Sequence, residues 1–442
     1  EERMTPPSPP VKIRDDDRWT VRFKQDDNFG QPRAYLIFEL LSNAVYRSPR
    51  DATLAQLYEV SVQDALNEYA YDASLAGLSY DLKVLPRGVR LTFGGYDEKL
   101  GEWAGYIGRK LARDVRSVLP ASKQEFERYR DGIRRAQAGF DVKQPYAHAI
   151  YFANLLLVPR PFDFPVEELK KALQDVTLQD LDEYAGRLWR RGRGEALIQG
   201  NLRKEEALKV VDAVDKALNF EAAGEEEYPA RVRATRFPRA QQYSLVRTVE
   251  PNPENSNAAC QIVIQCDGTG EKNHVLIEVI SAIIEEPYYE DLRTQKQLGY
   301  IVSSGVKVIE ETRNLNLIVQ SSVAPAEKLT METLKFLDSF RARYLSRLTE
   351  VDVARYVKGI VERKTDPDKN LVTEVTRNWG EMAAGRKTFD RLQREAAALL
   401  DVGKEDVLNF WDKYMDPGAP GGRRLLVSEV VPQVGVAAST VP

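Results

Sequence analysis

The stretch from Glu285 to Tyr300 carries the densest mixture of polar and aromatic side chains in this sequence. Within it, Arg293 and Tyr300 bracket the expected end of a helix and the start of a strand, where side chains can point into a cleft. An arginine fork can bind a peptide carbonyl or carboxylate, and a phenol can donate a hydrogen bond to a developing oxyanion. Taken alone, the spacing of these two residues favours simple packing over substrate binding.

Carboxylates in the same stretch are a second candidate for chemistry, because paired acids can do acid–base work. The candidates are Glu285, Glu286, Glu290 and Asp291. The alternative is that these acids pair with Arg293 and Lys296 at helical spacing. We favour the ion pairs as the explanation.

Histidine is the scarcest residue type with catalytic potential. His148 and His274 are the two histidines of the sequence and lie 126 positions apart. A zinc site in a hydrolase needs two or three histidines close together, and neither residue has a Glu, a Cys or a second His at ligand spacing. We expect both to be packed or capping histidines. The sequence therefore predicts no metal site in this chain and argues against a self-contained zinc or Ser-His-Asp hydrolase.

Composition narrows the class of protein further. The 442 residues include 63 basic and 67 acidic side chains, for a formal charge of −4. A general nucleic-acid binder would need a basic surface to neutralise phosphates, so no nucleic-acid partner is expected. No run of 18 apolar residues and no signal-like segment at the start of the chain is present, so no membrane partner is expected either.

The two cysteines bear on the compartment. Cys260 and Cys266 are six positions apart in a strand-like run, which places their Cα atoms about 20 Å apart, whereas a disulfide needs less than about 7 Å. Two reduced thiols fit a reducing compartment, and we therefore expect a cytoplasmic location.

The elements that must position these residues follow one order twice. In the first half a strand (34–41) leads to a long helix, a stop at Gly77 and a strand pair (78–85 and 89–93); in the second half the order is 258–266, 273–297, Gly299, 300–308 and 314–320. Gly77 and Gly299 are 222 positions apart. A repeat with a constant offset implies two homologous domains. The sequence predicts an α+β fold of two homologous α/β sandwich domains, each an antiparallel-rich sheet packed with helices.

Domain bounds follow from composition. Residues 1–10 are proline-rich and read as a linker in an extended conformation, 11–225 form the first domain and 226–442 the second. The junction is expected in the acidic stretch 221–238. Further helices are expected at 97–118, 122–139, 166–188, 204–218, 326–346, 350–363, 371–383 and 404–414. Further strands are expected at 195–199 and 425–429.

Several short segments of the sequence are distinctive. They are Leu292-Arg-Thr-Gln-Lys-Gln-Leu-Gly-Tyr-Ile-Val302, Phe23-Lys-Gln-Asp-Asp-Asn-Phe29, Asn67-Glu-Tyr-Ala-Tyr71, Leu75-Ala-Gly-Leu-Ser-Tyr-Asp-Leu82, Asn378-Trp-Gly-Glu381 and Phe389-Asp-Arg391. Together they resemble the C-terminal half of the insulysin/pitrilysin family of inverzincin peptidases. The resemblance extends over almost all of residues 11–430.

The resemblance implies an enzyme of two halves that close like a clam shell around a peptide chamber. The zinc motif His-x-x-Glu-His would lie in an N-terminal half that is missing here, so this chain has no cofactor of its own and is expected to be inactive alone. Arg293 and Tyr300 match the arginine and tyrosine that the C-terminal half contributes, and the resemblance favours substrate contact over packing. The implied partners are the N-terminal catalytic half, oligopeptide substrates and a second copy in a homodimer.

Two alternatives remain open. Arg377, Arg386, Lys387 and Arg391 cluster around Trp379-Gly380-Glu381, and because family members are regulated by nucleotides and other polyanions, this could be a polyanion site; a solvated charged face is the favoured reading. The chain could also be a non-catalytic scaffold or peptide-binding subunit of the same fold. Retention of Arg293 and Tyr300 argues for the catalytic reading, because a scaffold has no need of them.

Overall fold

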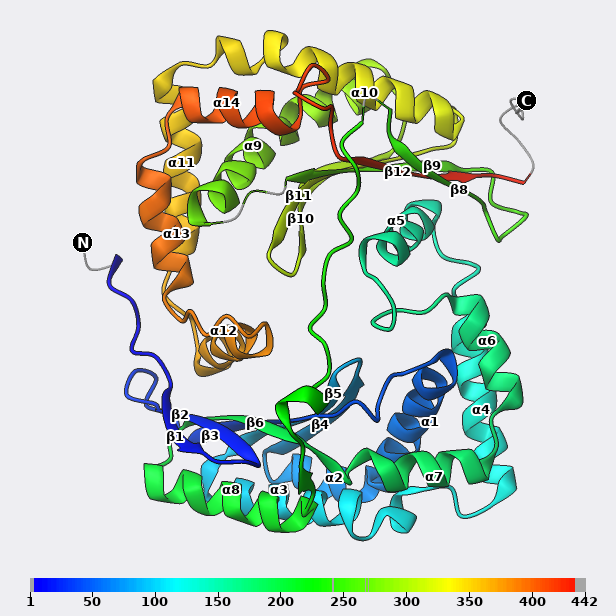
Figure 1. The fold of residues 1–442 in the computed structure, drawn as a ribbon, viewed down its shortest axis with the longest axis vertical. Helices are drawn as coiled ribbons and strands as arrows, with labels where there is room; N and C mark the ends of the chain where they lie inside the picture. Colours follow the sequence, from blue (N-terminus) through cyan, green and yellow to red (C-terminus); the bar gives the residue numbers. More distant parts are fainter. Residues whose placement is uncertain (1–3, 241, 267, 269, 434–442) are drawn as a thin grey trace.

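Two β-sheets lie at opposite ends of the molecule, with most helices on their outer faces (Figure 1). The computed structural model describes residues 4–240, 242–266, 268 and 270–433. Large apolar clusters fill the space between each sheet and its outer helices. The predicted α+β class is therefore confirmed.

The first sheet is built mainly from antiparallel strands. In spatial order they are β1 (Val11–Asp15), β2 (Trp19–Gln25), β6 (Arg191–Gly200), β3 (Arg33–Leu41), β5 (Gly88–Tyr96) and β4 (Leu78–Leu85), with β7 (Glu221–Ala222) beside β6. Among the described strands of this sheet, the parallel pairs are β2 with β6 and β6 with β7. Strand β4 forms a free edge.

The second sheet repeats the order of the five strands β2, β6, β3, β5 and β4. Its strands are β10 (Ile301–Ile309), β11 (Thr312–Ser321), β9 (Ala258–Cys266), β12 (Leu425–Val431) and β8 (Ser244–Val249), of which only β12 and β8 are parallel. Strand β9 starts 225 positions after β3, and β10 starts 223 positions after β4. The constant offset expected from Gly77 and Gly299 thus appears as two sheets of the same strand order, while the sequence bounds of the two domains stay a prediction.

Helices of the first half surround the first sheet, apart from α5. They are α1 (Pro49–Ala65), α2 (Asn67–Leu75), α3 (Asp97–Ala112), α4 (Lys123–Ala138), α5 (Pro145–Leu157), α6 (Val166–Asp175), α7 (Leu178–Leu188) and α8 (Lys204–Leu218). Local sequence sets several ends. Ser48 caps α1 by accepting a hydrogen bond from the Asp51 amide. Gly77 adopts a φ of +73° after α2, the left-handed conformation predicted for that position.

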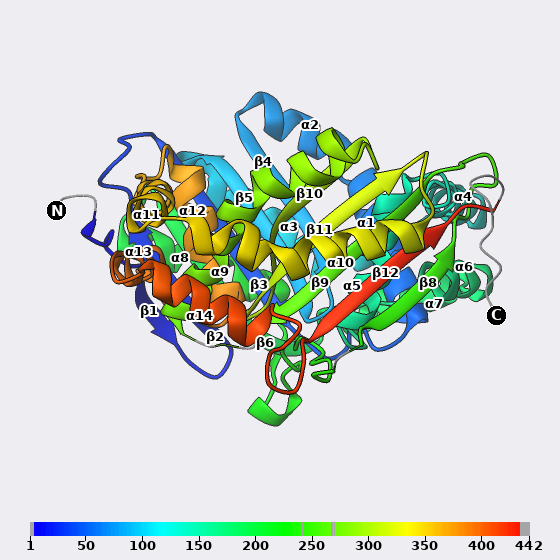
Figure 2. The same ribbon diagram turned by 90° about the horizontal axis from the view of Figure 1, so that it is seen from above.

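Helices of the second half lie mostly over the outer face and side of the second sheet, as Figure 2 shows for α10 and α14. They are α9 (Glu271–Tyr289), α10 (Ala326–Arg343), α11 (Glu350–Lys364), α12 (Leu371–Ala383), α13 (Arg391–Leu400) and α14 (Lys404–Tyr414).

Several elements differ from the sequence prediction. The long helix expected before Gly77 is two helices, α1 and α2, which are divided at Leu66. The single helix expected at 166–188 is two helices, because Val176 is extended and Thr177 starts α7 with a capping box to Asp180. Helix α13 and strand β8 were not predicted. Four of the six residues of β8 are only partly buried and two are exposed, so its apolar pattern is weak.

The two halves exchange helices across the molecule (Figure 1). Helix α5 belongs to the first half of the sequence but packs on β9 and β12, where Ala149, Ala153 and Leu157 meet Ala259, Val263, Leu426 and Val430. Helix α12, which starts 226 positions after α5, packs on β3 and β6 through Leu371, Val375, Trp379 and Met382. Each sheet is therefore covered on its inner face by a helix from the other half.

Two further findings concern cysteines and hydrophobic helices. Cys260 and Cys266 are buried on β9 and are not joined by a disulfide, as their spacing predicted, and burial raises the pKa of Cys260 to about 12. Within the described residues, no helix has the length and apolar character that crossing a bilayer requires.

Candidate functional site

The segment between α9 and β10 holds Arg293 and Tyr300. Its backbone continues from α9 into a π-helical turn over Glu290–Gln295. Tyr288, Leu292 and Leu298 are buried in the core of the second half, so they anchor the turn while neighbouring side chains face outward. Arg293 and Tyr300 therefore lie at the end of a helix and the start of a strand, as predicted.

Arg293 and Tyr300 are in direct contact. A guanidinium nitrogen of Arg293 donates a hydrogen bond to the carbonyl oxygen of Tyr300. The guanidinium carbon also lies 5.5 Å from the ring centroid of Tyr289, within the range of a cation–π contact. These contacts leave further guanidinium N–H donors for a ligand, since the group has five.

The Tyr300 side chain is 50% exposed, and its hydroxyl meets two glutamines. It lies 3.3 Å from Oε1 of Gln144, the residue before α5, and accepts a hydrogen bond from Nε2 of Gln320 at the end of β11. Gln320 is fully buried. Sequence reasoning missed both glutamines, because they lie 156 and 20 positions from Tyr300 and follow no motif.

The carboxylates of this stretch form ion pairs only in part as predicted. Asp291 Oδ2 lies 2.6 Å from Nζ of Lys296, as predicted, and its other oxygen is 3.5 Å from Arg343. Lys296 also pairs with Glu332 at 3.1 Å. Arg293, in contrast, is engaged with Tyr289 and Tyr300 rather than with an acid.

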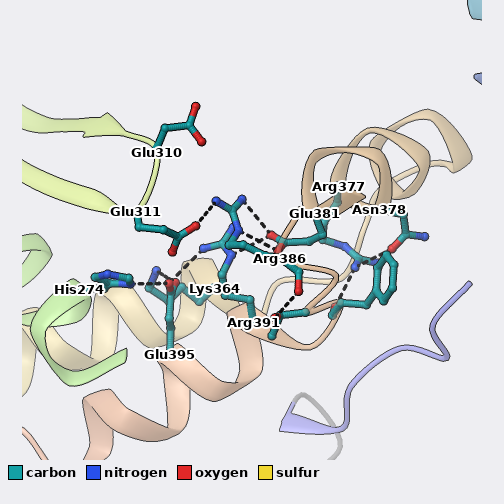
Figure 3. Close-up of polar contacts among 12 residues, drawn as sticks. His274, Glu310, Glu311, Lys364, Arg377, Asn378, Glu381, Arg386, Arg391 and Glu395 are labelled. Atoms are coloured by element: carbon teal, nitrogen blue, oxygen red, sulfur yellow. Dashed lines mark hydrogen bonds and ion pairs between the residues drawn. The ribbon is translucent and has the colours of Figure 1, made fainter. Parts of the chain in front are cut away.

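The arginines of the second candidate site are paired with acids (Figure 3). Arg386 lies 3.0 Å from Glu381 and 3.2 Å from Glu311, while Arg377 lies 2.9 Å from Asp368. The backbone amide of Lys387 donates to the Glu381 carbonyl oxygen. A polyanion would have to displace carboxylates from both guanidinium groups, so these ion pairs disfavour polyanion binding. The polyanion site stays a prediction.

The histidines are buried beside single carboxylates. His148 Nε2 lies 3.9 Å from Glu250, and His274 Nδ1 lies 4.0 Å from Glu395. Burial lowers the pKa of both imidazoles. Within the described residues, no group of three His, Cys, Asp or Glu side chains could hold a metal ion.

The two-sheet fold is that of the M16 peptidases. The crystal structure of pitrilysin superposes with a TM-score of 0.85 over 99% of this chain and 44% of that chain, at 17% identity. A crystal structure of a "peptidase M16 inactive domain" from Pseudomonas fluorescens superposes with a TM-score of 0.69 over 97% of this chain and 99% of that one, at 13% identity. These likenesses concern the fold.

Sequence comparisons identify the family. Residues 1–171 match the middle or third domain of peptidase M16, and residues 279–379 match the C-terminal lobe domain 4 of PqqF-like proteins. The chain is homologous to proteins of the insulysin/pitrilysin (M16) family of peptidases, as its motifs predicted. It is 32% identical to the insulin-degrading enzyme of Homo sapiens over 418 residues and 27% identical to a putative zinc protease, mug138, of Schizosaccharomyces pombe over 403 residues. These matches include 95% and 91% of this chain, but the chain spans only about 40% of the length of each relative.

Proposed function

We propose that this chain is the substrate-binding half of an insulysin-like zinc metalloendopeptidase that degrades oligopeptides in a closed chamber. An N-terminal half, outside this sequence, would carry the zinc and close against this one. The proposal is supported by identity to the insulin-degrading enzyme over 95% of the chain, together with coverage of only 40% of that enzyme. A homodimer and a cytoplasmic location belong to the same proposal.

The observation that carries the proposal is the contact between Arg293 and Tyr300. Arg293 would hold a backbone carbonyl of the peptide with its remaining N–H donors, and the Tyr300 hydroxyl would donate to the carbonyl oxygen on which charge develops. Tyr289, which Arg293 overlies, lines a hollow of about 460 Å³ together with Glu286 and Tyr356. This hollow offers space for a peptide side chain beside the arginine.

The test is Tyr300→Phe in an enzyme assembled from this chain and a zinc-bearing half. We expect kcat to fall roughly 100-fold or more with KM nearly unchanged, because the lost donor acts on charge that develops in the transition state. Tyr71→Phe, which alters a phenol that is also exposed, is the matched control and should leave kcat unchanged. Unchanged turnover in Tyr300→Phe would remove Tyr300 from the reaction.

The isolated chain provides a second arm of this experiment. Zinc analysis and a quenched-fluorescence peptide assay should find no stoichiometric zinc and negligible cleavage in the chain alone. Strong cleavage that a chelator abolishes would contradict the assignment of zinc to another half.

A scaffold or peptide-binding subunit is the second candidate function. The structural likeness to a protein described as an inactive M16 domain favours it. A scaffold predicts that both Tyr300→Phe and Arg293→Ala leave the turnover of the assembled enzyme unchanged, whereas a substrate-binding half predicts a loss in each.

A further inference from the structure

The amide of Gln320 has a forced orientation. One end of it lies 2.9 Å from the backbone nitrogen of Tyr146, in the first turn of α5. A backbone N–H can only donate, so the atom that faces it must be the amide oxygen. The NH₂ group of Gln320 must then point the other way, toward the Tyr300 hydroxyl and Gln144.

The orientation of Gln144 follows from that of Gln320. Its side-chain end lies 2.8 Å from Nε2 of Gln320, which is a donor. An NH₂ group at that distance would place two donors against each other, so the atom must be the oxygen Oε1. The same oxygen lies 3.3 Å from the Tyr300 hydroxyl, a long distance for an O–H···O hydrogen bond.

These two orientations fix the role of the Tyr300 hydroxyl. Its oxygen accepts from Gln320, so its proton must point away from Gln320. Among the described residues the acceptor for that proton is Gln144, and an incoming acceptor can replace it. A donor on the phenol oxygen also strengthens the O–H as a donor through cooperativity. We propose that Gln320 is a positioning residue that keeps Tyr300 a hydrogen-bond donor, and that Gln144 holds the proton weakly until a substrate carbonyl takes it.

The arrangement draws on both halves of the chain. Gln144 and Tyr146 lie at the start of α5, whereas Tyr300 and Gln320 lie at the facing ends of β10 and β11, where Ile301 pairs with Gln320. Helix α5 packs on β9 and β12 of the second sheet, and the Tyr146 amide in its first turn donates to Gln320 at the end of β11. The inference rests on the proposed role of Tyr300 toward substrate, which it deepens.

The first test is Gln320→Glu in the assembled two-half enzyme. A carboxylate cannot donate to the Tyr300 oxygen and instead accepts its proton, so we expect kcat to fall by up to about 100-fold while KM changes little. The matched control is Gln261→Glu, which places the same charge at another buried glutamine of this sheet, bonded to Asn316. If both variants lost kcat equally, the loss would come from burying a charge and not from the contact with Tyr300. That result would overturn the inference.

The second test reads the hydrogen bond in this chain alone. Ultraviolet resonance Raman spectra, taken as differences from Tyr300→Phe, isolate the Tyr300 doublet, whose intensities distinguish a phenol that donates from one that accepts. Gln144→Leu, an exposed change that should not impair folding, removes the acceptor and should shift the doublet toward the accepting form. Gln320→Glu should shift it toward the donating form.

The two tests separate the inference from the proposed function. Doublets that are unchanged in both variants would overturn the hydrogen-bond assignment. Shifted doublets together with unchanged turnover in Gln320→Glu would support the assignment and contradict a role of Tyr300 in the reaction.

Discussion

At the scale of single residues, Glu395 is a buried acid of the second half that two cations hold. It is fully buried, with its oxygens 2.7 Å from Lys364 Nζ and 3.0 Å from Arg391 (Figure 3). Burial raises the pKa of the Glu395 carboxyl, but Lys364 and Arg391 outweigh this effect and hold it below its usual value. The charge is therefore kept in the folded state by its two cations.

We expect Glu395→Gln to lower the free energy of unfolding at pH 7 by about 1.5–3 kcal/mol. The change removes one of the two acids from each cation, since Lys364 keeps Glu278 and Arg391 keeps Glu381. Since the folded-state pKa is depressed, the contribution of Glu395 is complete above the ordinary carboxyl pKa of 4.5 and is lost as the pH falls below it. When the pH is lowered from about 5, the free energy of unfolding should therefore fall less in the variant than in the parent protein.

Urea denaturation across this pH range measures both effects. Glu271→Gln, which breaks the largely exposed pair with Arg394, is the control and should cost no more than about 1 kcal/mol. A similar cost for the two variants would contradict the buried role of Glu395.

At the scale of elements, α5 and α12 bind the two sheets to one another. The apolar side of α12 lies on β3 and β6, with Leu371 and Val375 beside Ile37 and Leu197. Polar contacts reinforce it, because Asn378 Nδ2 donates to Gln199 Oε1 at 2.9 Å. A helix of the second half is thus part of the core of the first.

We expect Leu371→Ala to lower the free energy of unfolding by about 2–5 kcal/mol, because it opens a cavity under α12. The neighbouring residue offers a matched control, since Val372 is 47% exposed, and Val372→Ala should change the stability by less than about 0.5 kcal/mol. Chemical denaturation of both variants makes the comparison. Equal effects would show that α12 contributes little to the first sheet.

At the scale of the whole molecule, the exchange makes the halves interdependent. The segment 226–240 crosses the space between the two sheets (Figure 1), and the apolar face of α5 has its partners on the second sheet. Produced alone, residues 11–225 would expose that face and leave Ile37 and Leu197 without α12.

We therefore expect residues 11–225 to be poorly folded when produced alone and to co-purify with residues 226–442 when the two are produced together. Affinity purification through a tag on one part, followed by near-ultraviolet circular dichroism, measures this. If residues 11–225 were well folded and monomeric alone and did not bind residues 226–442, the two halves would not be interdependent.

The sequence predicted the repeated order of elements because hydrophobic periodicity and glycine stops are local signals. It did not predict which sheet α5 would cover, because Ala149, Ala153 and Leu157 mark a helix face but not its partner. At the site, Arg293 and Tyr300 came from a contiguous motif. Gln144 and Gln320 did not, because only the folded chain brings them to Tyr300. The acid Glu311, 75 positions before Arg386, was missed for the same reason.

The exchange of α5 and α12 also bears on how such a chain can evolve. If the repeat arose by duplication of one unit, each copy could not diverge freely afterwards, because its helix must keep fitting the sheet of the other copy. A bulkier residue at Ala153 has to be matched on β9 or β12, more than 100 positions away. Paired substitutions between α5 and the second sheet, and between α12 and the first, should therefore mark the history of this fold.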